Sequence, residues 1–199
     1  MLITLDPTGV RKRGQVPHRM AARRPLAGAR VGLVSNGLGR TEDLLGAVYA
    51  LLRDDGGVAS AVLVRKPHRS VPPLPEDWDR LLTDTDVVVA GFGGCGSCST
   101  RTIRDAMELE WAGIPSVALV HEDMLPAVEA MTRLADMPDY PYVVVGRART
   151  SLCDWDDATV AAVAKEIAGE TVALLGGTVL GSRRSDSTRL RRRLRKDRQ

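Results

Sequence analysis

The sequence predicts an α/β fold with a doubly wound, mainly parallel sheet of about five strands in a single domain. Short apolar runs rich in β-branched residues recur along the chain, and segments with helical periodicity lie between them. Strands that are joined by whole helices run parallel, because each crossover returns the chain to the same end of the sheet. The strands also lack polar alternation, which is typical of strands buried on both faces. This is the architecture of flavodoxin-like and Rossmann-like domains.

Before its midpoint, the chain alternates three predicted strands with two predicted helices. The strands are Arg30–Asn36, Ala59–Arg65 and Asp86–Gly91, of which the third is the most apolar. The first helix has Thr41 as its expected N-cap and ends at a glycine pair. A short second helix is expected over Glu76–Leu82, after a proline-rich stretch that breaks regular structure.

The second half of the chain continues the alternation. A helix is predicted over Ser99–Ala112, followed by a strand over Pro115–Val120. Apolar residues at helical spacing between 124 and 134 predict the next helix. The fifth strand is Tyr142–Val145, and Asp156 is the expected cap of a last helix.

Three segments of different composition divide the chain. Residues 1–29 form an N-terminal extension with a short strand at Leu2–Leu5, and residues 30–181 form the α/β domain. Residues 182–199 carry nine Lys and Arg against two Asp, so the rest of the chain has a net negative charge. We expect this basic tail to be mostly disordered. No aromatic residue is interleaved there for base stacking, so nucleic acid is not expected as a partner beyond contacts of the tail.

Length and composition limit the class of protein. With 199 residues, 44% of them hydrophobic and a net charge of +3, the chain can bury a full core. The apolar runs are too short to span a bilayer and no secretory signal is visible, so a cytoplasmic protein with no membrane partner is expected. Three cysteines do not make a disulfide framework. A homodimer is compatible with the sequence, which does not fix the oligomeric state.

Polar residues follow four of the predicted strands. In open α/β sheets, ligands bind at the carboxyl ends of the strands. These ends carry Asn36-Gly37, Lys66-Pro67-His68, Gly91–Cys98 and His121-Glu122. The sequence therefore predicts a site for a small-molecule substrate at this edge of the sheet, although strand ends also need polar turn residues for structural reasons.

A Cys-x-x-Cys motif, Cys95 to Cys98, follows the most apolar strand and opens the next helix. The N–H groups and the dipole at a helix start favour a thiolate, and a fall of about two units in the pKa of a cysteine makes it mostly thiolate near pH 7. Such a fall corresponds to roughly 2.7 kcal/mol of stabilisation of the anion. Cys95, in the loop, is the expected nucleophile, and Cys98, nearer the helix, is the expected resolving thiol.

Other interpretations of the two cysteines remain open. They could be a buried structural pair, although the surrounding glycines leave little to pack against them. A zinc site would need two more ligands, for which Cys153 and His121 are the obvious candidates, and we assign no metal. We expect Cys153, beside Trp155, to be a packed thiol rather than a third reactive one.

The same segment also matches a dinucleotide-binding pattern. Gly91, Gly93 and Gly96 form G-x-G-x-x-G between a strand and a helix, and Glu122 supplies an acidic residue after the next strand. Against this, the motif follows the third strand rather than the first. A dinucleotide-dependent oxidoreductase therefore stays as an alternative, as does a non-enzymatic thiol-redox sensor or adaptor.

The Cys95-Gly96-Ser97-Cys98 tetrapeptide resembles the Sec-Gly-Ser-Cys signature of the UGSC family of selenoproteins and their cysteine homologues, with Cys95 at the selenocysteine position. Weaker matches occur at Asp6-Pro7-Thr8, Asn36-Gly37, Lys66-Pro67, Gly113-Ile114-Pro115 and Met137-Pro138-Asp139. The segment is more distantly similar to the Sec-Gly-Thr-Cys region of selenoprotein B of glycine, sarcosine and betaine reductases. There, the selenolate attacks carbon next to a carboxylate and displaces an amine reductively.

The chain departs from the family pattern at three places. Cys95 replaces selenocysteine, which implies a slower nucleophile with a higher pKa. Arg101 stands where relatives often have a further cysteine, and Arg147-Ala148 stands where many have His-Pro. A base or ligand supplied from that last position is therefore in doubt, and His121 is the candidate to replace it.

Together these features predict a cysteine-based reductase or lyase. Cys95 would attack a small polar substrate, and Cys98 would then close a disulfide and release the reduced product. An external thiol or a thioredoxin-like protein would restore the dithiol, and no other cofactor is expected. His121 or Glu122 would transfer a proton to the leaving group. The expected substrate-binding residues are Asn36, Gly37, Lys66, Gly94, Gly96, Ser97 and Arg101.

Overall fold

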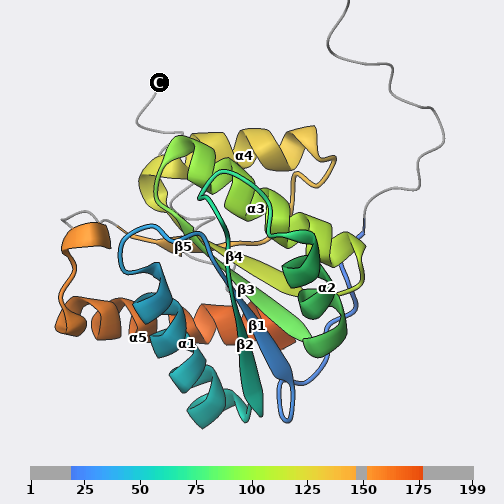
Figure 1. The fold of residues 1–199 in the computed structure, drawn as a ribbon, viewed down its shortest axis with the longest axis vertical. Helices are drawn as coiled ribbons and strands as arrows, with labels where there is room; N and C mark the ends of the chain where they lie inside the picture. Colours follow the sequence, from blue (N-terminus) through green and yellow to red (C-terminus); the bar gives the residue numbers. More distant parts are fainter. Residues whose placement is uncertain (1–18, 147–151, 177–199) are drawn as a thin grey trace, which may run out of the picture.

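A computed structural model describes residues 19–146 and 152–176 of the chain (Figure 1). The expected strand at Leu2–Leu5 and the basic tail over 182–199 lie outside these residues. Within them, the N-terminal extension is tied to the domain by Glu110, whose carboxylate accepts a hydrogen bond from Ala21 N at 2.6 Å and pairs with Arg23 at 2.8 Å.

Five parallel strands form one sheet in the order β2-β1-β3-β4-β5. The strands are β1 (Arg30–Ser35), β2 (Ser60–Arg65), β3 (Val87–Gly93), β4 (Ser116–His121) and β5 (Val143–Val145). The order is that of flavodoxin-like domains, so the predicted α/β class and the parallel sheet are confirmed. β3, the most apolar strand, lies at the centre of the sheet and is buried along its whole length.

Helices cover both faces of the sheet (Figure 1). α1 (Thr41–Gly56) and α5 (Asp157–Gly176) pack on one face, while α2 (Pro75–Asp84), α3 (Gly96–Trp111) and α4 (Leu125–Leu134) pack on the other. Two short 3₁₀ turns, η1 (Glu122–Met124) and η2 (Leu152–Asp154), complete the described elements. None of the helices in the described residues has the length and apolar character that a membrane-spanning segment needs.

The central strand shows why the apolar runs do not alternate with polar residues. Val87 and Val89 of β3 belong to the core under α1 and α5. Val88 and Ala90 belong to the second core, under α2, α3 and α4. Because successive side chains point to opposite faces and both faces are covered, every position of such a strand has to be apolar.

The observed helix starts correct two of the sequence-based expectations. Thr41 is the first residue of α1 rather than its N-cap, a position that Arg40 takes without a side-chain cap. α3 begins at Gly96 instead of Ser99, so that the whole Cys-x-x-Cys motif lies at the helix start. The expected cap of α5 is confirmed, because Asp156 Oδ1 accepts a hydrogen bond from Thr159 N at 2.7 Å.

The sheet order creates a switch point between β1 and β3. From β1 the chain moves outward to β2, and it then crosses back to start β3 on the other side of β1. The loops after β1 and β3 therefore diverge to opposite faces of the sheet. In folds of this kind the crevice between two such loops is where ligands bind.

Candidate functional site

Cys95 occupies the N-cap of α3, directly after the central strand. Its backbone is extended, and its sulfur accepts a hydrogen bond from Cys98 N at 3.3 Å. The carbonyl of Cys95 accepts hydrogen bonds from Ser99 N at 2.8 Å and Ser99 Oγ at 2.6 Å. The sulfur thus takes the place that a serine or aspartate oxygen has in an ordinary N-cap, at the positive end of the helix dipole.

The two cysteines of the motif differ sharply in exposure. The structure joins Cys95 and Cys98 in a disulfide with their Cα atoms 5.1 Å apart. Cys95 is partly exposed at the helix start, whereas Cys98, in the first turn, is 0% exposed. An incoming molecule can therefore reach Cys95 directly and Cys98 only through its partner.

The loop after β1 packs against the segment that carries Cys95. Asn36 is buried, and its amide donates to Phe92 O at 2.7 Å while its Oδ1 accepts from Leu38 N at 3.0 Å. A Cβ on Gly94 would lie 2.9 Å from the Leu38 side chain, so only glycine fits there without a shift. Asn36 thus holds two loops together, and both of its polar groups are already engaged.

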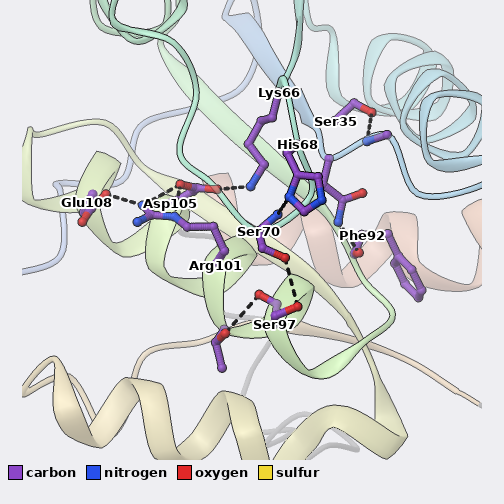
Figure 2. Close-up of polar contacts among 12 residues, drawn as sticks. Ser35, Lys66, His68, Ser70, Phe92, Ser97, Arg101, Asp105 and Glu108 are labelled. Carbon is purple, nitrogen blue, oxygen red and sulfur yellow. Dashed lines mark hydrogen bonds and ion pairs between the residues drawn. The ribbon is translucent and has the colours of Figure 1, made fainter.

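The loop after β2 runs beside the start of α3 and is fastened to it at two places (Figure 2). Lys66 Nζ lies 2.7 Å from Asp105 Oδ2, and Ser70 Oγ lies 2.9 Å from Ser97 Oγ. Between these anchors, His68 is exposed, and its Nδ1 accepts a hydrogen bond from Ser70 N at 3.3 Å. His68 therefore lies on the loop that Ser70 joins to Ser97, between the two cysteines of the motif.

A buried ion cluster lies behind this loop. Arg101 Nε donates to Asp105 Oδ1 at 2.6 Å, and its guanidinium also pairs with Glu108. Burial lowers the pKa of Lys66, and the neighbouring Asp105 opposes that shift only in part. Burial likewise raises the pKa of Asp105 in spite of Lys66 and Arg101. Both cations that were expected to hold a substrate carboxylate are thus already engaged with acidic side chains of α3.

His121 and Glu122 come from the neighbouring strand. β3 and β4 pair Gly93 with Val120, so the end of β4 lies beside the Cys95 segment. The His121 ring packs edge-on against Phe92, with 6.3 Å between the ring centroids. Its Nδ1 accepts a hydrogen bond from Asp123 N at 3.2 Å, and Glu122 begins the short turn η1.

The glycines of the dinucleotide-like pattern do not have the packing roles that they have in a pyrophosphate-binding loop. Gly91 lies inside β3, where a Cβ would lie 3.4 Å from Leu45. Gly93 provides the close strand–helix contact, since its Cβ would be 3.0 Å from Ser99 Cα. A Cβ on Gly96 would meet no atom of the rest of the protein within 4 Å. In the nucleotide-binding fingerprint the third glycine makes the close helix contact, so this loop has the spacing without the corresponding geometry.

The third cysteine, Cys153, belongs to the turn η2, which packs against the loop after β1. Cys153 is exposed in η2, which contradicts the expectation of a packed thiol, because this turn lies at the surface and only Leu152 of it is buried. A Cβ on Gly39 of the loop after β1 would lie 3.0 Å from Cys153 Sγ. Across the described parts of the chain, no three His, Cys, Asp or Glu side chains are placed to hold a metal ion together.

The loops after β1, β2, β3 and β4 thus bring most of the expected residues to one edge of the sheet. Gly94, Gly96 and Ser97 surround Cys95, with Gly37 in the adjacent loop. Sequence reasoning did not assign a role to His68 or Ser70. The available signal was the position of His68 just after a strand, whereas the contact between Ser70 and Ser97 joins residues far apart in the chain.

Comparison with known proteins agrees with the site. A search of curated proteins finds no match. The sequence model described as the UGSC family matches residues 3–177, which is most of the chain and includes the whole α/β domain seen here. The fold, the disulfide-forming pair at the start of α3 and this match fit a thiol-redox role. The chain belongs to the UGSC family.

Proposed function

We propose that this protein is a thiol-dependent reductive enzyme that acts on a small polar substrate. The observation that carries the proposal is the asymmetry of the dithiol: Cys95 is accessible at a helix N-terminus, and Cys98 is buried within disulfide-bonding distance of it. A buried structural disulfide would not need one accessible sulfur at the ligand-binding edge of the sheet. A nucleophile and its resolving partner need this arrangement.

In the proposed reaction, the Cys95 thiolate attacks a carbon–heteroatom or heteroatom–heteroatom bond. The new bond joins Cys95 to the substrate, and the heteroatom leaves with the electron pair of the broken bond and takes up a proton. Cys98 then attacks the Cys95 sulfur, and the substrate group departs with an electron pair and a second proton. The dithiol loses two electrons and the substrate gains them, so an external thiol or thioredoxin-like protein has to restore the dithiol.

The proton for the leaving group would come from an imidazole or a carboxyl at the same edge. His121 and His68 each accept a backbone N–H at Nδ1, so Nε2 is the ring nitrogen that would face a substrate. We propose His121 or Glu122 as the donor, with His68 as a further candidate from the other side of the dithiol.

An anionic group on the substrate would be held by the start of α3 rather than by a free cation. Lys66 and Arg101 already pair with Asp105. The backbone of Gly94, Gly96 and Ser97 lies at the positive end of the helix dipole, where a carboxylate is stabilised. This supports a small molecule with a carboxylate as the substrate class.

Intact-mass measurements on two single variants test the proposal. The reduced proteins would be incubated with a panel of such acids and of low-molecular-weight disulfides. Cys98→Ser is expected to accumulate a covalent adduct, because attack proceeds and resolution cannot. Cys95→Ser is expected to form none while keeping its circular dichroism spectrum. If Cys95→Ser turned over any member of the panel at the wild-type rate, the proposed nucleophile would be wrong.

A further inference from the structure

A line of side-chain contacts joins the loop after β2 to the sulfur of Cys95. Ser97 Oγ lies 3.9 Å from Cys95 Sγ, and it accepts a hydrogen bond from Ser70 Oγ at 2.9 Å. Ser97 is exposed in the first turn of α3, whereas Ser70 is half-buried and lies 27 residues earlier in the chain. Figure 2 shows the two hydroxyls directed toward each other, one from the loop and one from α3. Hydroxyls of two different elements therefore form a line that ends at the accessible sulfur of the dithiol.

The directions of these hydrogen bonds decide where the Ser97 proton can go. Each hydroxyl has one proton to donate and two lone pairs that accept. Ser70 gives its proton to Ser97 Oγ, so the proton of Ser97 remains available for another acceptor. Cys95 has no proton while it is bonded in the disulfide, so Ser97 has to be the donor in the contact between the two. The hydrogen bond from Ser70 thus leaves the Ser97 hydroxyl oriented to direct its proton to the Cys95 sulfur.

The turn that carries Ser70 is held in place independently of Ser97. Val71 N donates to His68 O at 3.3 Å, and Ser70 N donates to His68 Nδ1 at 3.3 Å. At the start of the same loop, Lys66 is buried and forms an ion pair with α3. Because these contacts already order the loop, Ser70 can orient the Ser97 hydroxyl without a further large loss of conformational entropy.

We propose that Ser70 is a positioning residue for the nucleophile: it orients the Ser97 hydroxyl, which donates a hydrogen bond to the Cys95 thiolate once the disulfide is reduced. The inference rests on the proposed role of Cys95 as the attacking thiol. A thiolate carries a full negative charge, so it attracts the hydroxyl proton more strongly than a neutral disulfide sulfur does. Cys98 N lies 3.3 Å from the same sulfur, so the anion has two donors. Hydrogen bonds to the charged form of a group favour that form.

The start of α3 also has charged and titratable neighbours on the elements around it. These are Arg40 after β1, Arg65, Lys66, His68 and Arg69 at the end of β2 and after it, Arg101 and Asp105 on α3, and His121, Glu122 and Asp123 at the end of β4 and after it. Replacing a serine by alanine leaves all of these charges in place. A change in the ionisation of Cys95 after such a replacement therefore reports the loss of the hydroxyl.

Loss of this hydrogen bond has a signature that a structural defect does not share. Without the donor, the Cys95 thiol ionises at higher pH, so its reaction with an alkylating agent is slower below the midpoint of ionisation. A thiolate that is harder to form is also more nucleophilic, with a Brønsted slope of about 0.4–0.5, so the limiting rate at high pH stays equal or increases. A defect that only hinders access to the sulfur lowers the rate at every pH and leaves the midpoint unchanged.

The test is the pH dependence of alkylation by iodoacetamide, on the reduced protein in a Cys153→Ser background, with the modified residue identified by peptide mapping. The Cys95 thiolate displaces iodide, so the rate follows the thiolate fraction. Ser97→Ala is expected to move the midpoint of the profile up by about 0.5–1 pH unit and to slow alkylation below the midpoint by about two- to fourfold. Ser70→Ala is expected to move the midpoint in the same direction by at least about 0.3 pH unit. Ser70→Thr, which keeps the hydroxyl, is expected to restore the parent profile.

Thr100→Val is the matched control, because Thr100 Oγ1 lies in the same helical turn but donates to the Ser97 carbonyl at 3.0 Å rather than to a sulfur. It is expected to keep the parent midpoint, and a shift as large as that of Ser97→Ala would contradict the proposal. If Ser97→Ala moved the midpoint and Ser70→Ala did not, the positioning role of Ser70 would be wrong. If neither moved it, the hydrogen bond to the thiolate would be wrong while the dithiol mechanism would stand. If iodoacetamide modified Cys98 and spared Cys95, the proposed nucleophile would be wrong, and the proposed function would fail with the inference.

Discussion

Lys66 Nζ lies 2.7 Å from Asp105 Oδ2, and the side chains of both residues are 1% exposed. This ion pair fixes the loop after β2 to the middle of α3, behind the turn that carries the two cysteines. Removing one member of a buried pair leaves an uncompensated charge, which is strongly unfavourable in a low-dielectric interior. The loop and the helix face should therefore depend on each other for their stability.

Lys66→Met is expected to lower the free energy of unfolding by up to about 3 kcal/mol, because the Asp105 carboxylate loses its buried partner Lys66 and keeps Arg101 alone. Urea denaturation followed by circular dichroism measures the change. The double variant Lys66→Met/Asp105→Leu should be less destabilised than the sum of the two single changes, since it removes the buried ammonium and the buried carboxylate together, while Arg101 keeps Glu108. Arg80→Ala, which removes an exposed pair with Asp77, should change the stability by less than about 1 kcal/mol. Strict additivity in the double variant would contradict the coupling.

Two glycines at the junction of β3 and α3 should respond in opposite ways to alanine. A Cβ on Gly93 would lie 3.0 Å from both Ser99 Cα and Val120 Cγ1, so Gly93→Ala should cost about 1–3 kcal/mol of stability. Gly96→Ala meets open space inside the first helical turn and should be neutral or stabilising by up to about 1 kcal/mol. Thermal denaturation measures the stability of both variants, and a thiol assay shows whether the dithiol still reacts. If the protein bound a nicotinamide dinucleotide and Gly96→Ala abolished that binding, the interpretation of this segment as a dinucleotide-binding fingerprint would be supported instead.

The fold was predictable because its strands are apolar on both faces. β1 to β5 lie within three residues of their predicted bounds, since runs such as Val87 to Ala90 leave no polar face for an exposed strand. The start of α3 was harder to predict. Cysteine is not among the usual N-cap residues and glycine is a weak helix former, so no local pattern indicates that Cys95 caps a helix beginning at Gly96.

The site was predictable where it follows from the ends of strands, and not where it depends on contacts across the fold. The position of Cys95 and Cys98 follows from the strand before them. That Lys66 is buried against Asp105, and that Ser70 meets Ser97, depends on how a loop crosses a helix more than twenty residues further along the chain. Local sequence patterns do not indicate such long-range contacts between side chains.

The stability of the fold at low pH should reveal the pair formed by Arg30 and Asp86. The Arg30 side chain and backbone N–H both donate to Asp86, and these hydrogen bonds hold the pKa of that carboxyl below its ordinary value. A folded-state pKa below the unfolded value means that the stabilisation is present above about pH 4 and is lost as the pH falls further. Asp86→Asn should therefore lower the melting temperature at neutral pH, with a difference that shrinks below about pH 4. A constant difference across that range would contradict the assignment.

Mild oxidation should link Cys95 to Cys98 and leave Cys153 in its reduced form. The first two have Cα atoms 5.1 Å apart, within the range that a disulfide needs. Cys153 is exposed and therefore accessible to the oxidant, so burial does not protect it from oxidation. Thiol labelling followed by peptide mapping should find the label on Cys153 alone. A bridge between Cys95 and Cys153 as the main product would show that the roles of the cysteines are assigned wrongly.

The central claim is that Cys95 is the attacking thiol and Cys98 the resolving one, and trapping with oxidised glutathione tests it most directly. The reduced Cys95→Ser and Cys98→Ser variants, both in a Cys153→Ser background, would be exposed to it near neutral pH and measured by intact mass. The account predicts one stable glutathione adduct on Cys98→Ser, none on folded Cys95→Ser, and an internal disulfide without adduct when both thiols are present. An adduct that forms readily on Cys98 of the Cys95→Ser protein, with Cys95 inert in the other variant, would contradict it.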